Sequence, residues 1–252
     1  MRHQVKRCAL DEEVISQSLR NSYWRVKVLD EVTSTQTLMR ESNPSHGSVF
    51  TAEYQSQGRG RLDRTFHSPK FSGLLSSIYI EPSLSTELWG WVPLLVGMSV
   101  AQVLNEITNT AAFQTKWPND VIAPGGKICG ILCETFRSGI IIGIGINVST
   151  QLDELPVESA SSIYLETENS IDRNVLLASI LTRLNENLAR WEAGQSFESG
   201  YKEISATLGR EISALLPDGS VLASKAVGLT SDGGLLLESG EAITVGDIVH
   251  LR

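Results

Sequence analysis

The order of hydrophobic and polar residues predicts a chain that mixes strands and helices. Segments in which apolar positions alternate or run together predict strands, and segments with apolar residues three or four apart predict helices. The predicted strands lie at 25–30, 47–54, 73–80, 113–117, 128–136 and 139–148, and 162–165 fits a further short strand. The predicted helices lie at 13–19, 86–107, 172–191 and 196–207, and a short helix that extends to about Glu41 has N-cap candidates at Thr33-Ser34-Thr35. Residues 55–69 have no apolar period and are expected to form a long loop.

Two of the predicted strands form the most apolar part of the chain. Residues 128–136 and 139–148 are almost continuous apolar runs, separated only by Arg137 and Ser138. Such runs are typical of strands that are covered on both faces, and the short connection is typical of a tight hairpin. We therefore expect these two strands at the centre of a sheet.

The pattern changes after Leu208. Turn signals at Pro217-Asp218-Gly219 and at 231–234 separate a series of short predicted strands. These strands lie at 210–216, 220–230, 234–238, 242–244 and 248–251. The pattern indicates a small β-barrel or sandwich at the C-terminal end, so we expect one domain over 1–206 and a second over 207–252.

Composition and charge exclude several classes of protein. The chain has 252 residues, of which 41% are apolar and 20% charged, as in ordinary globular proteins. Its longest apolar run, at 139–148, is too short to cross a bilayer. The net charge of -8 disfavours non-specific binding to nucleic acid. Three cysteines without a CxxC pair, and acidic rather than apolar residues after the basic N-terminus, favour a reducing cytoplasm and no targeting leader.

The loop at 55–69 contains the first candidate for chemistry. Gly58-Arg59-Gly60-Arg61 is followed by Arg64, and glycines let backbone N–H groups approach an anion while arginines supply forked donors for phosphate or carboxylate oxygens. The pattern fits neither a P-loop nor a Rossmann turn, because no helix follows. The alternative is an exposed surface loop without a ligand. If it does bind, we expect the loop to become ordered over its ligand.

Three further motifs combine small and charged residues at the ends of strands. They are Lys116-Trp117-Pro118-Asn119-Asp120, Gly125-Gly126-Lys127 before an apolar strand, and Gly143-Ile144-Gly145-Ile146-Asn147. Each has a structural alternative: a strand-ending turn, a hairpin lysine facing solvent, and a buried asparagine with a protein partner. Together with the loop they bring several cations and one carboxylate, a combination suited to neutralising charge in phosphoryl or nucleotidyl transfer.

Other catalytic machinery is not apparent in the sequence. We find no Ser-His-Asp or Cys-His arrangement, and the four histidines have no spacing typical of metal ligands. Cys129 and Cys133 lie in an apolar strand and are expected to be small buried residues.

The motifs resemble those of the biotin–protein ligases in both order and spacing. The resemblance is carried by Thr33-Ser34-Thr35-Gln36, Glu53-Tyr54-Gln55, Gly58-Arg59-Gly60-Arg61, Lys116-Trp117-Pro118-Asn119-Asp120, Gly126-Lys127-Ile128-Cys129-Gly130-Ile131-Leu132-Cys133-Glu134 and 143–148. It implies an α+β fold: a mixed, mainly antiparallel sheet flanked by helices, like that of class II synthetases, with a C-terminal SH3-like barrel. It also implies an ATP-dependent ligase that forms biotinyl-5′-AMP and then transfers biotin to a lysine of the biotin carboxyl carrier domain of acetyl-CoA carboxylase or a related carboxylase.

The resemblance assigns roles to individual residues. The catalytic candidates are Lys127, Arg59 and Arg61. The biotin-binding candidates are Thr33, Ser34, Thr35, Gln55, Gly58, Arg59, Gly60, Arg61 and Lys127. The ATP-binding candidates are Arg61, Arg64, Phe66, Lys116, Asn119, Asp120, Lys127 and Asn147. Mg²⁺ is the implied cofactor, held mainly by the phosphates, with Asp120 and Asn147 as candidate protein ligands.

Some positions depart from the pattern of the family. Thr35 stands where an asparagine is frequent, Asp63 where a glycine is common, and Phe66 where a tryptophan is usual. A lipoate–protein ligase is the alternative enzyme, but its arginine- and glycine-rich signature is not found. A biotin-responsive repressor is the alternative binding protein. Because only 24 residues precede the first predicted strand, we expect no winged-helix domain and no DNA binding. The expected oligomeric state is a monomer or a homodimer.

Overall fold

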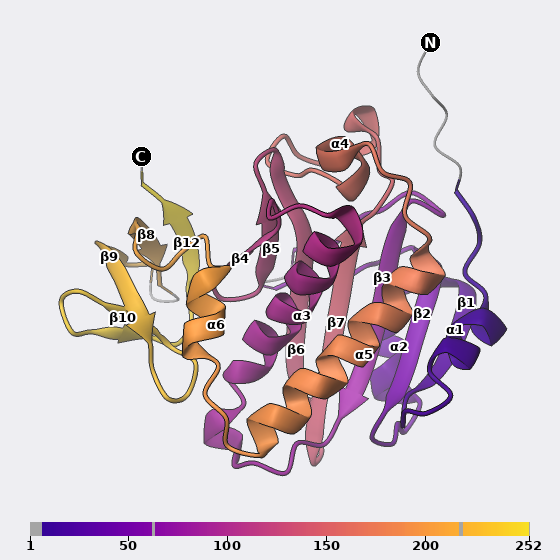
Figure 1. The fold of residues 1–252 in the computed structure, drawn as a ribbon, viewed down its shortest axis with the longest axis horizontal. Helices are drawn as coiled ribbons and strands as arrows, with labels where there is room; N and C mark the ends of the chain where they lie inside the picture. Colours follow the sequence, from indigo (N-terminus) through magenta and orange to yellow (C-terminus); the bar gives the residue numbers. More distant parts are fainter. Residues whose placement is uncertain (1–6, 62–63, 217–218, 252) are drawn as a thin grey trace.

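Two β-sheets and six α-helices make up the part of the chain that the computed structural model describes, residues 7–61, 64–216 and 219–251 (Figure 1). The larger sheet has the strand order β1-β2-β3-β7-β6-β5-β4. Its strands are β1 (Arg25–Val32), β2 (Ser48–Gln55), β3 (Gly73–Ile80), β4 (Gln114–Lys116), β5 (Asp120–Ala123), β6 (Gly126–Phe136) and β7 (Gly139–Asn147). Among these, only β1 and β2 pair in parallel. Within the described ranges, no helix has the length and apolar character that a membrane span requires.

The helices cover the large sheet unequally on its two faces. They are α1 (Glu12–Ser18), α2 (Thr35–Glu41), α3 (Trp91–Thr108), α4 (Ile163–Thr167), α5 (Arg173–Glu192) and α6 (Glu198–Glu203), with short 3₁₀ turns at Thr86–Leu88 and Leu152–Glu154. The long helices α3 and α5 pack side by side over one face of the sheet (Figure 1). The short helix α2 packs against β2, β3 and β7.

Alternation of side chains along the central strands explains the two faces. Ile78 of β3 and Ile142 of β7 belong to the main core together with α3 and α5. The adjacent residues Tyr79 and Ile141 form a separate cluster with Met39 of α2. The α2 face therefore contains less apolar packing, and this is the face on which the strands present glycines and polar residues.

A buried ion pair connects β2 of the larger sheet to helix α5. Glu53 of β2 and Arg173 of α5 are 2% and 4% exposed, and Arg173 Nη1 lies 2.7 Å from Glu53 Oε2. Arg173 also donates to the carbonyl of Gly73 over 2.9 Å, while Glu53 accepts from the backbone of Leu10. The N-terminal segment, β2, β3 and α5 are thus joined by this ion pair and the hydrogen bonds around it.

The second sheet forms the C-terminal part of the chain. Its order is β11-β10-β9-β8-β12, from β8 (Glu211–Leu215), β9 (Val221–Leu229), β10 (Leu235–Leu237), β11 (Ala242–Ile243) and β12 (Asp247–His250). Two tryptophan indoles bind the β9–β10 turn of this sheet: Trp117, after β4, donates to the carbonyl of Gly233 over 3.1 Å, and Trp91 of α3 donates to that of Ser231 over 3.0 Å.

The structure confirms the predicted class, a mainly antiparallel sheet with helices and a small C-terminal β domain, and corrects some elements. Residues 162–165 belong to helix α4 rather than to a strand, because Ser162 caps the helix by accepting from Leu165 N. The helix predicted at 86–107 is broken before Trp91, and α6 is shorter than predicted. Strand β5 was not predicted, and β6 is only partly buried because a cavity opens beside it.

Candidate active site

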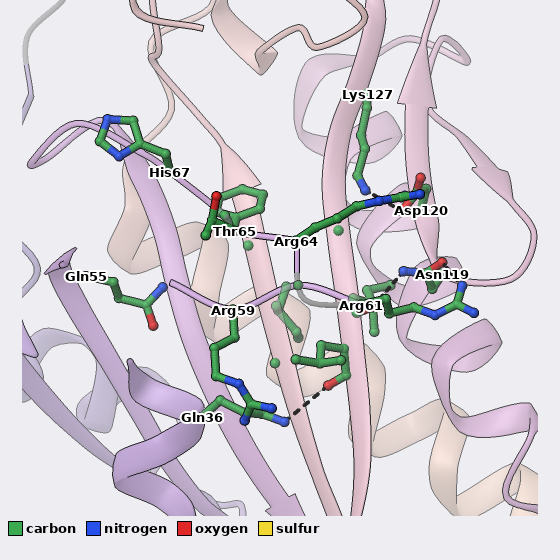
Figure 2. A pocket seen from close by; sticks show the side chains of 18 of the residues that line it. Gln36, Gln55, Arg59, Arg61, Arg64, Thr65, His67, Asn119, Asp120 and Lys127 are labelled. Atoms are coloured by element: carbon green, nitrogen blue, oxygen red, sulfur yellow. Dashed lines mark hydrogen bonds and ion pairs between the residues drawn. The ribbon is translucent and has the colours of Figure 1, made fainter. Parts of the chain in front are cut away.

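A cavity of about 680 Å³ lies on the α2 face of the large sheet, under the loop that follows β2 (Figure 2). Such a volume is within the range typical of small-molecule sites. Residues from α2, the loop, β3, β5, β6, β7 and the segment 156–160 line it, and so does Asp247 of the C-terminal sheet. The motifs that are distant in the sequence therefore meet at one site.

Hydroxyl and amide side chains form one end of the cavity. The Thr35 backbone N and Oγ1 both donate to Gln55 Oε1, over 2.7 and 3.0 Å, and Thr35 Oγ1 is 2.8 Å from Ser77 Oγ. Ser77 in turn donates to Gln36 Oε1 over 3.0 Å. Ser34 is only 2% exposed, and its hydroxyl has no hydrogen-bond partner within the described part of the chain. A buried hydroxyl without a partner is costly, so this position is suited to a polar group of a ligand.

The other end of the cavity contains cations. Lys127 Nζ lies 2.6 Å from Asp120 Oδ1, and Arg61 Nη1 donates to Asn119 Oδ1 over 2.8 Å. Both pairs lie away from Gln36 and Gln55 in Figure 2. The strand β6 begins at Gly126, where a side chain is excluded because φ is +144° and a Cβ would lie 2.5 Å from the Ser159 carbonyl. Because Lys127 and Arg61 both line this end, it is suited to bind an anionic group.

The loop after β2 folds back over the cavity as a short hairpin. Gly60 N donates to the carbonyl of Arg64 over 2.7 Å, and Phe66 N donates to that of Gly58 over 3.0 Å. A Cβ at Gly58 would lie 2.2 Å from the Phe66 carbonyl, so the hairpin requires glycine there. The Phe66 ring lies against the cross-strand pair Gly130 and Gly145, with Gly145 in closest contact. It forms an apolar part of the cavity wall.

Each described arginine of the loop has a protein partner. Arg59 pairs with Glu134, Arg61 with Asn119, and Arg64 with Asp247 of β12. Burial raises the pKa of Glu134, but the hydrogen bonds from Gln36 and Arg59 and the charges of Arg59 and Arg40 outweigh it and hold this pKa below its ordinary value. Glu134 is therefore ionised at neutral pH.

Asn147, at the end of β7, organises the segment beside Lys127. Its side chain is 5% exposed and donates to the carbonyl of Ser161 over 3.0 Å. The Lys127 backbone pairs with the same segment, since Lys127 N donates to the Ser159 carbonyl over 2.8 Å and Ser161 N to the Lys127 carbonyl over 2.9 Å. Asn147 thus has a protein partner at one of its two polar atoms.

The cysteines near the cavity are not activated. Burial raises the pKa of Cys129, and burial likewise raises the pKa of Cys133 to about 12, so both thiols stay protonated at neutral pH. Cys8, Cys129 and Cys133 are all free thiols. Among the described residues, no group of three or more His, Cys, Asp or Glu side chains is arranged to hold a metal ion.

Most of the candidate residues from the sequence lie together. The lining includes Ser34, Thr35, Gln55, Arg59, Gly60, Arg61, Arg64, Phe66, Asn119, Asp120, Lys127 and Asn147. Thr33, Gly58 and Lys116 are not part of the lining. Asp63 lies outside the described residues. The sequence analysis predicted no role for four further residues near the cavity: Gln36, Ser77, Glu134 and Asp247. Ser77 and Glu134 are polar residues in mainly apolar strands, and this was the signal that could have identified them.

Comparison with known proteins agrees with this arrangement. Residues 27–150 match the model of the biotin/lipoate A/B protein ligase family, and residues 207–251 match that of the biotin protein ligase C-terminal domain. A biotin–[acetyl-CoA-carboxylase] ligase of Mycobacterium tuberculosis is 30% identical over 213 residues, which cover 82% of this chain and 80% of the relative. A bifunctional ligase/repressor BirA of Bacillus spizizenii is 31% identical, with coverage of 85% and 69%.

Solved structures resemble the whole fold. The biotin protein ligase of Aquifex aeolicus in complex with biotin and ATP superimposes with a TM-score of 0.80 and 35% sequence identity, covering 90% of this chain and 99% of that chain. A biotin complex of its R40G mutant gives a TM-score of 0.79 with 34% identity, covering 91% of this chain and 99% of that chain. The similarity therefore extends across both sheets.

Proposed function

The chain belongs to the biotin/lipoate A/B protein ligase family, and we propose that its cavity is the active site of an ATP-dependent biotin–protein ligase. In the first step the biotin carboxylate attacks the α-phosphorus of ATP, and the bond to the β-phosphate oxygen breaks to release pyrophosphate. In the second step the amine of an acceptor lysine attacks the biotinyl carbonyl carbon, loses a proton, and AMP leaves. The acceptor we propose is a biotin carboxyl carrier domain.

One observation supports this function most strongly: a single cavity has an end lined by hydroxyl and amide groups and an end that carries Lys127 and Arg61. The free Ser34 hydroxyl and the Thr35–Gln55 pair offer hydrogen bonds suited to the ureido ring of biotin. Lys127, at the cationic end, is placed to meet the carboxylate and the α-phosphate. A lipoyl head group has no hydrogen-bond donors to match the polar end, so the cavity favours biotin.

The residues at the cationic end supply the charge that the first step requires. A carboxylate approaching a triphosphate is opposed by Coulomb repulsion, which grows as water is excluded. Lys127 and Arg61 offset this repulsion in the proposed site, and Asp120 and Asn119 hold them in place before the substrates bind. Arg64, anchored by Asp247, brings a further cation to the cavity from the loop.

Mg²⁺ accompanies ATP in this proposal and would lower the negative charge of the phosphates. No cluster of carboxylates is available for it among residues 7–61, 64–216 and 219–251. Two protein groups could complete its coordination: the carboxylate of Asp120 and the side-chain oxygen of Asn147. The amide nitrogen of Asn147 is already hydrogen-bonded. These residues fit an ion that arrives with the nucleotide better than one that is held by the protein alone.

We further propose that residues 1–206 form the catalytic domain and 207–252 a second domain. The match of a separate family model to 207–251 supports this division. A net charge of -8 supports the proposal that the chain does not bind DNA, and the unpaired cysteines suit a reducing cytoplasm.

The experiment that tests the function is exchange of labelled pyrophosphate into ATP, measured separately with biotin and with lipoate. We expect exchange that depends on biotin and on Mg²⁺. Exchange with lipoate in place of biotin would make the protein a lipoate ligase, and no exchange with either acid would contradict an adenylating function.

A further inference from the structure

One carboxylate outside the proposed chemistry holds Arg59. The Nη1 and Nη2 atoms of Arg59 donate to the two oxygens of Glu134, over 3.1 and 3.0 Å. Gln36 Nε2 donates to the same carboxylate over 3.0 Å, and Arg40 Nη2 lies 3.5 Å from it. The Glu134 side chain is 22% exposed and that of Arg59 is 43% exposed. The pair is thus bidentate and charge-assisted, the geometry that gives arginine–carboxylate pairs their directional strength.

This pair is connected to the polar end of the cavity. Gln36, which donates to Glu134, also accepts from Ser77 and donates to the Ile141 carbonyl over 3.2 Å. Ser77 contacts Thr35, and Thr35 contacts Gln55. A continuous series of hydrogen bonds therefore runs from the floor of the cavity to the side chain of Arg59 in the loop above it.

The pair also determines which way Arg59 points. Figure 2 shows Arg59 beside Gln36, away from Lys127 and Asp120. With both of its terminal nitrogens donating to Glu134, Arg59 does not present them to the cationic end. Arg59 therefore differs from Arg61, which lies beside Asn119 of the KWPND segment.

We propose that Glu134 is a positioning residue, which holds Arg59 across the polar end of the cavity and thereby sets how long the biotinyl group is retained. The proposal rests on the function proposed above. It assigns Arg59 to closing the site rather than to stabilising charge on phosphorus. The adenylate should then escape faster when the pair is broken, while the rate of its formation at saturating substrate should change little.

Four variants test this role: Glu134→Gln, Glu134→Asp, Arg59→Ala and the double variant Glu134→Gln with Arg59→Ala. For Glu134→Gln we expect the dissociation rate of biotinyl-AMP and the KM for biotin to rise roughly ten-fold, with kcat for pyrophosphate exchange within about two-fold of the parent. Glu134→Asp retains the charge and should show a smaller change. Because the two residues act as one unit, the double variant should be no worse than Arg59→Ala.

Arg40→Ala is the matched control. Arg40 contacts the same carboxylate but lies outside the cavity lining, so adenylate retention should be unchanged. Unchanged dissociation in Glu134→Gln, additive effects in the double variant, or a loss of kcat with normal KM would each overturn the positioning role. If the parent protein shows biotin-dependent exchange, these results contradict this role alone; absence of exchange in the parent contradicts the proposed function and this proposal with it.

Discussion

The ammonium group of Lys127 lies 2.6 Å from Oδ1 of Asp120, and the two residues come from neighbouring strands at the cationic end of the cavity. Lys127 is further fixed because its backbone N and carbonyl both pair with residues 159–161. A cation held by two separate segments, β5 and residues 159–161, is oriented before any substrate binds, and such preorganisation makes electrostatic stabilisation effective.

Lys127→Ala should therefore abolish most adenylation without unfolding the protein. We expect biotin-dependent pyrophosphate exchange to fall on the order of 100-fold or more, with an unchanged circular dichroism spectrum. Lys202→Ala, at an exposed position in α6, is the control and should retain full activity. Near-normal exchange by folded Lys127→Ala would contradict the assigned role.

Ser34→Ala should weaken biotin binding without lowering stability. The Ser34 hydroxyl is buried and has no partner among the residues that the structure describes, so we expect that its removal breaks no hydrogen bond and leaves the free energy of unfolding unchanged or slightly higher. The Kd for biotin should rise roughly ten-fold, the value of one hydrogen bond. Titration calorimetry and thermal unfolding measure the two effects. A loss of stability together with unchanged biotin affinity would show that the hydroxyl has only a structural role.

Gly145→Ala should move the Phe66 ring out of the cavity. A Cβ at Gly145 would lie 2.8 Å from the ring, which is too close for van der Waals contact. Because the ring belongs to the loop, we expect retention of biotinyl-AMP to fall while the sheet stays intact. Gly200→Ala, whose new methyl group would meet only Met98 Cε at 3.5 Å, is the control. If Gly145→Ala and Phe66→Ala have independent effects on retention, the ring does not act through its contact with Gly145.

Arg173→Ala should destabilise the fold strongly. It leaves the carboxylate of Glu53 buried without its counter-charge, a change that typically costs about 3–5 kcal/mol. Arg183→Ala removes an ion pair to the exposed Glu106 and should cost less than about 1 kcal/mol. Chemical denaturation of both variants gives the comparison, and equal losses in the two would contradict the structural importance of the buried pair.

Stability should decrease as the pH falls below about 6.5, partly because of His250. Burial and the charges of Lys116 and Arg210 lower the pKa of His250 from 6.5 to about 4. Between these values the unfolded chain binds more protons than the folded chain, so the free energy of unfolding decreases as the pH decreases. His250→Gln should flatten this dependence in the upper part of the window, above the range where carboxylates such as Glu134 titrate. Denaturation at a series of pH values measures it; identical slopes for the variant and the parent would exclude His250 as the cause.

The sequence predicted the strands and helices of the sheet region well, because β3 and β7 are mainly apolar and α5 begins at the cap Asp172. The prediction was wrong where tertiary contacts determine the secondary structure. Residues 163–167 form a helix because Ser162 caps it and Glu166 contacts Gly125 in the β5–β6 turn, a contact that no local pattern reveals.

The candidate site was predictable as a set of motifs but not as a geometry. The glycines and arginines of the loop indicated an anion site, yet the sequence did not show that Glu134, Asn119 and Asp247 provide partners for those arginines. The mutual repulsion expected of Arg59, Arg61 and Arg64 is therefore offset by protein groups. Whether the loop becomes ordered on ligand binding stays a prediction, which limited proteolysis with and without biotinyl-AMP can test.

Transfer of biotin to an acceptor tests the central claim most directly. The protein is incubated with ATP, Mg²⁺, biotin and a biotin carboxyl carrier domain, and the acceptor is analysed by intact mass spectrometry and peptide mapping. We predict the addition of a single biotinyl group at one lysine of the acceptor, absent when ATP is omitted, when lipoate replaces biotin, or when Lys127→Ala replaces the parent. An acceptor that stays unmodified while the protein binds both biotin and ATP, or modification that does not require Lys127, would contradict the account.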